Sequence, residues 1–302
     1  MTVELSSETL PAPASEPQAT EKQVSLWKQL RAALRSIPVM IAFVLFMLII
    51  FVAVCAPLLG TVDPVAINPT ERLAKVSAAH WLGTDAFGRD TYSRALYGAR
   101  VSLIVGIGAT VMSLAAGLLI GVVAGYFKFA DSIIMRVMDG IMAIPGILLA
   151  IALVSLTGGS LITVLVAITI PEIPRVVRLV RGVILSVRTE PYVEAAESLG
   201  TRVRTILWRH MIPNTVAPLI VQGTYIFAAA ILTEATLSFL GAGLPPEIPS
   251  WGNMMSEGRM YFRLLPGLIL YPGILLALTL LCVNVLGDVL RDVLDPRMVK
   301  KS

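Results

Sequence analysis

The polar stretch at residues 189–213 carries side chains suited to binding another protein, in a chain that is otherwise strongly apolar. Pro191 fits a first helical turn and Gly200 fits a helix end, so we expect a short helix between them. Glu194 and Glu197 would point away from its small-residue face, where carboxylates can pair with arginines of a partner. The stretch predicts a docking element, although two ordinary surface helices would show the same pattern.

Helical spacing in this stretch defines two faces. In the helix predicted at about 190–199, one face consists of Tyr192, Ala195, Ala196 and Leu199. Alanines on a helix face let another surface approach closely. A second amphipathic helix is predicted after Gly200, with Val203, Ile206, Leu207 and His210 on one face and arginines, Arg204 among them, off it. Pro213 then begins the next apolar segment.

Residue sets for catalysis are missing from the sequence. It has no G-x-x-x-x-G-K-[ST] phosphate loop, no G-x-S-x-G motif, and only two histidines, His80 and His210, without zinc spacing. Cys55 and Cys282 lie in apolar segments and are expected to be packing residues. We therefore expect no enzyme, no metal and no cofactor on this chain. Any energy from ATP, with its magnesium, must come through a partner.

The composition indicates an integral membrane protein. The 302 residues are 56% hydrophobic and 15% charged, with a mean hydropathy of +0.80, whereas a soluble chain is about a quarter charged. The net charge of +4 comes from basic residues that flank apolar segments. The lipid bilayer is therefore an expected partner and nucleic acid is not.

Six apolar runs are long enough to cross a membrane as helices. They cover about 38–59, 101–126, 137–157, 160–181, 213–239 and 265–287. We predict an all-α membrane protein of six transmembrane helices. Its regions would be a disordered, basic N-terminal tail at 1–36, the first span with an external segment at 37–100, a five-helix core at 101–290, and a C-terminal tail at 291–302.

The distribution of basic residues predicts the orientation. If the 189–213 stretch is cytoplasmic, both termini are cytoplasmic too, and 17 of the 24 lysines and arginines lie inside. This obeys the positive-inside rule. The external segment would hold Asp85, Arg89 and Arg94 in local ion pairs.

Two further features concern the spans. Gly117, Gly121 and Gly125 form successive G-x-x-x-G pairs, which favour close packing of a neighbouring helix. Glu234, with Ser238 one turn later, lies near the outer end of the fifth span. An intramembrane carboxylate is a candidate for a translocation path or gate, although near the interface it could equally pair with a neighbour.

Several motifs resemble one family, the permeases of binding-protein-dependent ABC importers. Glu194-Ala195-Ala196, three residues and Gly200 look like the family's EAA loop, with His210 and Ile212 replacing its usual Ile and Leu before Pro213. Further similar motifs are LGTDxxGRD, SFLGAGxPP, SWGNM and NxxGDxLRDxLDPR. They are typical of the C-type subunit in the dipeptide, oligopeptide and nickel branch.

The resemblance implies a type I importer permease fold with cytoplasmic coupling helices. The residues it implies for coupling to the ATPase are Glu194, Ala195, Ala196, Glu197, Gly200, Arg204, His210 and Pro213. The implied partners are a homologous second permease, two cytoplasmic ATPases and an extracytoplasmic solute-binding protein, in a bacterial inner membrane. Short peptides are the favoured substrate.

Other functions stay open at this point. Nickel, glutathione and opine importers share these motifs, and the absence of a His, Cys or Met cluster near the outer mouth favours peptides over nickel. A gradient-driven secondary transporter is the rival from another class, but such proteins show internal repeats and ionisable residues in mid-membrane. A membrane scaffold would leave the 189–213 stretch without a purpose.

Overall fold

The computed structural model describes residues 36–294, and every regular element among them is helical. The helices of eight residues or more, together with the short α8, are α2 (Ile37–Cys55), α3 (Thr91–Tyr126), α4 (Lys128–Met142), α5 (Gly146–Thr157), α6 (Leu161–Arg188), α7 (Pro191–Ser198), α8 (Val203–Ile206), α9 (Ile212–Phe239), α10 (Trp251–Gly258) and α11 (Gly267–Leu294). The predicted N-terminal tail, apart from Ser36, and the last eight residues of the predicted C-terminal tail lie outside the described residues.

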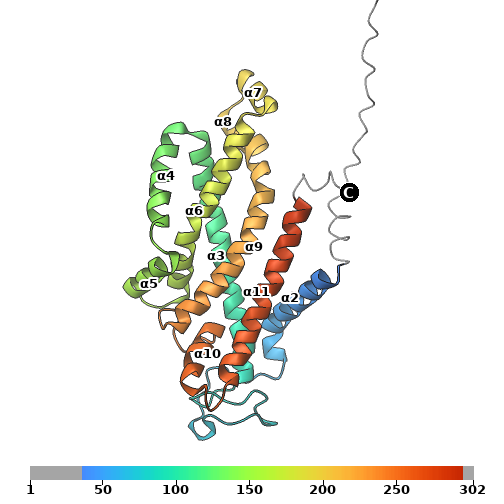
Figure 1. Cartoon of the computed structure of the whole chain (residues 1–302), viewed down its shortest axis with the longest axis vertical. Helices are drawn as coiled ribbons and strands as arrows, with labels where there is room; N and C mark the ends of the chain where they lie inside the picture. Colours follow the sequence, from blue (N-terminus) through green and yellow to red (C-terminus); the bar gives the residue numbers. More distant parts are fainter. Residues whose placement is uncertain (1–35, 295–302) are drawn as a thin grey trace, which may run out of the picture.

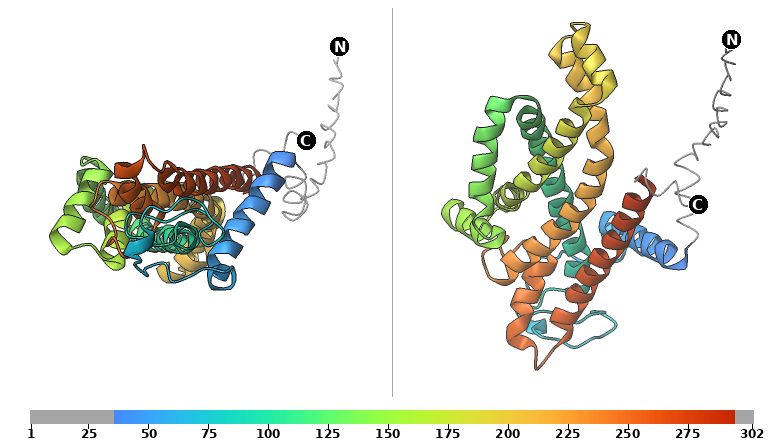
Figure 2. Two further views of the ribbon diagram at one scale, coloured as in Figure 1. Left: turned by 90° about the horizontal axis from the view of Figure 1, so that it is seen from below. Right: turned by 45° about the horizontal axis from the view of Figure 1, so that its top comes forward.

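Four long helices, α3, α6, α9 and α11, run along the length of the molecule (Figure 1). The short helices α7 and α8 lie at one end, here called the α7 end. Helix α10 and the loop at 59–90 lie at the other, the α10 end. Helix α2 contacts α3 and α11 but runs obliquely to them, so that its first residues stand apart from the bundle (Figure 2).

The closest helix packing joins α3 to α6. The predicted glycine pairs of α3 face branched side chains of α6 at the same four-residue spacing; the pairs are Gly117 with Val176, Gly121 with Val180, and Gly125 with Ile184. A Cβ atom on Gly121 would lie 2.7 Å from the Cβ atom of Val180. The glycines therefore serve close packing of a neighbouring helix, as predicted, and that helix belongs to the same chain.

The predicted third span, 137–157, is wrong as a single helix. Its residues belong to α4 and α5, which meet at an angle of 86°. Pro145 is extended (φ −52°, ψ 125°), and a proline disfavours helical geometry in the residue before it. The segment around Lys128 and Asp131, which lies between the second and third predicted spans, is the first part of α4.

The count of six spans is not reproduced among the described residues. Four helices are long and apolar enough to cross a membrane, or five spans if the bent pair counts as one. Helix α6 is long enough, but it carries Glu172, Arg175 and Arg178 in mid-helix. These charges have partners: Arg175 pairs with Glu172 at 3.3 Å, and Arg178 with Asp139 of α4 at 2.6 Å.

Replacing Gly121 by leucine should destabilise the protein, because the new side chain would meet Val180 and the carbonyl oxygen of Val177. Overpacking of a tight contact costs about 1–3 kcal/mol. The matched control is Gly140→Leu in α4, where no atom lies within 4 Å of an added Cβ. Thermal unfolding of the purified variants in detergent measures the difference. Equal midpoints for the two variants would contradict the packing assigned to α3 and α6.

Candidate functional site

Helix α7 has the boundaries that the sequence predicts. Pro191 occupies its first turn, and the chain leaves it at Gly200 with a positive φ of 71°. The backbone N–H of Gly200 donates to the carbonyl of Glu197 at 2.9 Å, and that of Thr201 to the carbonyl of Ala196 at 3.1 Å. This pair of bonds is the Schellman motif, which glycine forms with least strain.

The inward face of α7 differs from the predicted one. Val193 is 0% exposed and belongs to one buried apolar cluster with side chains of α6 and α9, and Ala196 packs partly against the same cluster. Of the other residues assigned to the inner face, Tyr192, Ala195 and Leu199 are exposed. Val193 and Ala196 are three residues apart and share a face as readily as the predicted set. Helical spacing alone could not decide between the two faces.

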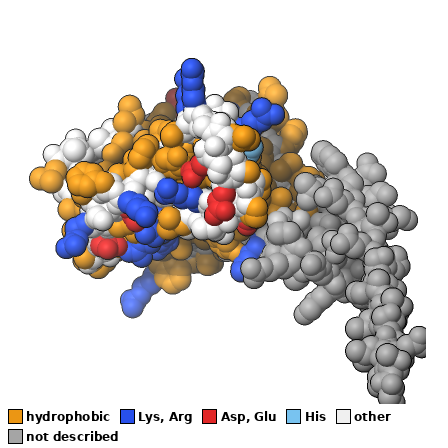
Figure 3. Space-filling view, turned by 90° about the horizontal axis from the view of Figure 1, so that it is seen from above, with side chains coloured by type: hydrophobic (Ala, Val, Ile, Leu, Met, Phe, Trp, Pro, Cys, Tyr) orange, Lys and Arg blue, Asp and Glu red, His pale blue; other side chains and the backbone are white. Residues whose placement is uncertain are grey.

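The opposite side of α7 and the turns after it form an exposed surface at the α7 end. We call it the docking surface; its residues are Glu194, Ala195, Glu197, Leu199, Arg204 and Trp208. Leu199 is 86% exposed and Trp208 is 64% exposed. Arg204, Trp208 and Arg209 line a shallow hollow of about 480 Å³. Acidic, basic and apolar side chains share this end of the molecule (Figure 3), as they do on surfaces that bind proteins.

The chain from Val203 into α9 is less regular than the predicted second helix. One turn of α8 is followed by a wider π-type turn at Leu207–Met211, and then by α9. Ile206 is buried and His210 half-buried, as predicted, but Val203 is exposed. The carbonyl of His210 accepts a hydrogen bond of 2.6 Å from Asn214, and Pro213 lies exposed in the first turn of α9. Such wide turns often occur at functional sites.

Glu234 and Ser238 lie together near the α10 end of α9, far from the docking surface. Glu234 is 0% exposed, and its Oε1 atom accepts a hydrogen bond of 2.8 Å from Ser238. The carboxylate thus has a hydrogen-bond partner one turn away in the same helix. The Ser238 hydroxyl also accepts from the backbone N–H of Leu244 at 3.3 Å, which ties α9 to the turn before α10.

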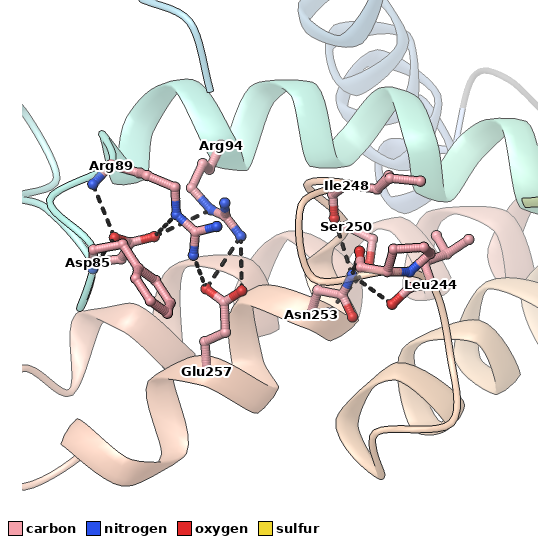
Figure 4. Close-up of polar contacts among 10 residues, drawn as sticks. Asp85, Arg89, Arg94, Leu244, Ile248, Ser250, Asn253 and Glu257 are labelled. Carbon is pink, nitrogen blue, oxygen red and sulfur yellow. Dashed lines mark hydrogen bonds and ion pairs between the residues drawn. The ribbon is translucent and has the colours of Figure 1, made fainter. Parts of the chain in front are cut away.

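An ion cluster at the α10 end joins the loop at 59–90 to α10 (Figure 4). Arg89 donates to Asp85 at 2.6 Å and to Glu257, and Arg94 donates to Glu257 at 3.3 Å. Sequence reasoning named Asp85, Arg89 and Arg94 but missed Glu257. One observation pointed to a further carboxylate. Asp90 caps α3 by accepting from the Ser93 N–H at 2.7 Å, so that Asp85 alone remains nearby to pair with the two buried arginines.

Asn253 holds the turn that precedes α10. Its amide nitrogen donates to three backbone carbonyls, those of Leu244, Pro245 and Ile248, at 2.9–3.2 Å (Figure 4). A turn with its carbonyls bound in this way is fixed in shape, and it positions the start of α10 against α9.

His80 is held between two carboxylates in the loop at 59–90. Its Nδ1 atom lies 2.9 Å from Asp90, and its Nε2 atom lies 3.2 Å from Glu71. A neutral imidazole can donate only one of these bonds. The hydrogen bond to Asp90, above all, and the contact with Glu71 raise the pKa of His80 above its ordinary value of 6.5.

The attachment of this loop should therefore depend on pH. A raised pKa means that the contribution of His80 to stability is fully present below 6.5 and is lost as the pH rises through the raised pKa. Trypsin should cleave after Arg72 or Lys75 at a constant rate below pH 6.5 and faster as the pH rises above it, after correction for the enzyme's own pH profile. Trypsin should cleave the His80→Gln variant at a rate that does not rise with pH in this way. The same pH profile in both proteins would show that His80 is not responsible.

These features define a class of protein: a helical membrane protein with an exposed surface of acidic, basic and apolar side chains at one end. The sequence matches the family model "Binding-protein-dependent transport system inner membrane component" over residues 117–300. A probable peptide ABC transporter permease of Sinorhizobium fredii is 52% identical over 249 residues, which are 82% of this chain and 85% of that protein. A dipeptide transport system permease of Alkalihalophilus pseudofirmus is 40% identical over 95% of this chain and 96% of its own length.

Two more comparisons bear on specificity and fold. A glutathione transport system permease of Pectobacterium atrosepticum is 44% identical over 74% of each chain. Among solved structures, a chain of the MetNI methionine ABC transporter in inward-facing conformations matches with a TM-score of 0.50 and 18% identity, covering 67% of this chain and 94% of its own. That likeness concerns the fold alone.

The chain belongs to the family of binding-protein-dependent transport system inner membrane components. It is a permease subunit of an ABC importer and a multi-pass membrane protein, and it is not an enzyme. Membership implies partners that supply ATP hydrolysis and deliver the solute. A gradient-driven secondary transporter, the rival function considered from the sequence, belongs to a different class from the ABC importers.

Proposed function

We propose that this chain is one of two homologous permeases in an ATP-driven importer of short peptides in a bacterial inner membrane. The names of the relatives at 52% and 40% identity, a peptide and a dipeptide permease, support the substrate class. The glutathione permease matches less of the chain. Nickel and opines, the other substrates considered, have no such support.

We infer that the docking surface binds a cytoplasmic ATPase and that α7 transmits its movement. The observation that carries this inference is the burial of Val193. Its side chain lies in one apolar cluster with Val180 and Ile184 of α6, and with Met211 and Leu219 around the start of α9. A displacement of α7 would therefore move two long helices, while its exposed face stays available to a partner. Closure of the ATPases would in this way convert the permease between inward- and outward-facing states.

The α7 end then faces the cytoplasm, with both termini on that side, as the distribution of 17 of the 24 basic residues favours. The Glu234–Ser238 pair lies at the outer end in this orientation. We infer that the pair holds the outer gate closed, because it joins α9 to the turn before α10.

Two substitutions test the coupling role. Gly200→Ala forces a side chain into a left-handed conformation at a cost of about 1 kcal/mol, without a clash, since no atom lies within 4 Å of the added Cβ. Glu194→Gln removes the charge-assisted bond that we propose to the ATPase, and its loss should weaken the affinity for the ATPase about tenfold. Both should lower peptide uptake into vesicles and ATPase recovery with the complex.

The matched controls are Gly182→Ala, at an open helical site, and Glu190→Gln, an exposed carboxylate just before α7. Both should transport normally. If all four variants insert into the membrane and transport alike, the coupling role of α7 is wrong.

Reporter fusions test the orientation. A periplasm-only reporter joined after Asp85 should be active, and one joined after Leu199 should be silent, because the two residues lie at opposite ends of the bundle. Western blots of both fusions control for expression. The reverse pattern would place the docking surface outside and overturn the proposed contact with the ATPase.

A further inference from the structure

A second polar feature at the α7 end has no place in the coupling mechanism. It is a hollow of about 710 Å³ between α6, α9 and α11. Its polar lining comes from Asn214, Gln222 and Tyr225 of α9 and from Arg291 of α11, beside the apolar Leu179 and Val221. The sequence NxxGDxLRD, singled out above, supplies the α11 side of this hollow.

The motif explains how α11 meets α9. Gly287 lies so close to Thr224 that an added Cβ would be only 2.5 Å from the Thr224 hydroxyl oxygen. One residue later, Asp288 accepts a hydrogen bond of 3.0 Å from the hydroxyl of Tyr225. The glycine thus allows the close approach, and the tyrosine fixes Asp288 at the edge of the hollow.

Arg291 is one helical turn beyond Asp288, and among the described residues it has no carboxylate within ion-pair distance. Arg178 and Arg181, in contrast, are both paired with aspartates of α4. Arg291 therefore lines the hollow as a cation without an ion-pair partner among the described residues, and the carboxylate of Asp288, held by the lining residue Tyr225, lies one helical turn away. Packing between helices does not need this arrangement, whereas a ligand with both charges would match it.

We propose that this hollow is a binding site for the short peptide on its way to the cytoplasm, a proposal that rests on the proposed function. Arg291 binds the terminal carboxylate and Asp288 the terminal ammonium, while the amides of Asn214 and Gln222 bond to the peptide group. The Cα atoms of Asp288 and Arg291 are separated by about 4.5 Å along the helix, and an extended dipeptide spans about 7 Å. The two side chains reach far enough to close this difference.

A protection experiment tests the site in the assembled complex, without nucleotide or binding protein. Gln222→Cys, in a chain with Cys55→Ser and Cys282→Ser, is labelled with N-ethylmaleimide at increasing concentrations of dialanine. Dialanine should protect the cysteine. Dialanine amide and N-acetyl-dialanine, which each lack one terminal charge, should need about tenfold higher concentrations.

Adding Arg291→Gln should abolish the difference between dialanine and its amide. The control Arg136→Gln changes an exposed arginine of α4 outside the hollow and should preserve it. Absence of protection, or equal protection by all three peptides, would overturn the site. The site would also be overturned if the cysteine at position 222 did not react with N-ethylmaleimide in the absence of peptide, because the second permease would then cover the hollow. Dialanine uptake by the parent complex separately tests the proposed function.

Discussion

The burial of Val193 makes a short surface helix part of the protein's interior. Helix α7 has only eight residues, too few to be stable in water by itself. Burying one valine contributes about 1.5–3 kcal/mol, and it joins α7 to the apolar cluster to which α6 and α9 also contribute. The exposed positions of α7, Glu194 and Leu199 among them, keep their orientation because the inward face is anchored.

The two ends of the bundle are held by different forces. At the α7 end the contacts of Val193 are apolar and insensitive to pH or salt. At the α10 end, Glu257 and the arginines Arg89 and Arg94 form a largely buried ion cluster, and His80 bridges two carboxylates. A buried ion cluster fixes geometry more than it adds stability. Between the ends, the glycines of α3 bring it into register with α6.

Local chemistry allowed much of the fold to be predicted. Pro191 and Gly200 define α7 because a proline in the first turn and a glycine with positive φ act through the backbone alone. The face that α7 buries depends on its neighbours, and the residue that decides it, Val193, was not in the predicted set. The 86° bend between α4 and α5 was not predicted, since the apolar run at 137–157 is long enough to form one span.

Contacts between distant residues were the hardest to predict. Glu257 is more than 160 residues from the arginines that it binds, and no periodicity links them. The six-span count failed because α6 carries charged residues in mid-helix and because α4 and α5 are not one straight helix. The docking residues themselves were identified by their motif, which specifies residue types and spacing but not which side chains are exposed.

The most direct test of the account is photo-crosslinking from the docking surface in the assembled, ATP-hydrolysing complex. Benzoylphenylalanine placed at Leu199, which is 86% exposed, should form a covalent adduct with the ATPase subunit. The same group at Met260, which is 81% exposed at the α10 end, should form none. An intact, active complex that gives no ATPase adduct from Leu199, or gives one from Met260, would contradict the account.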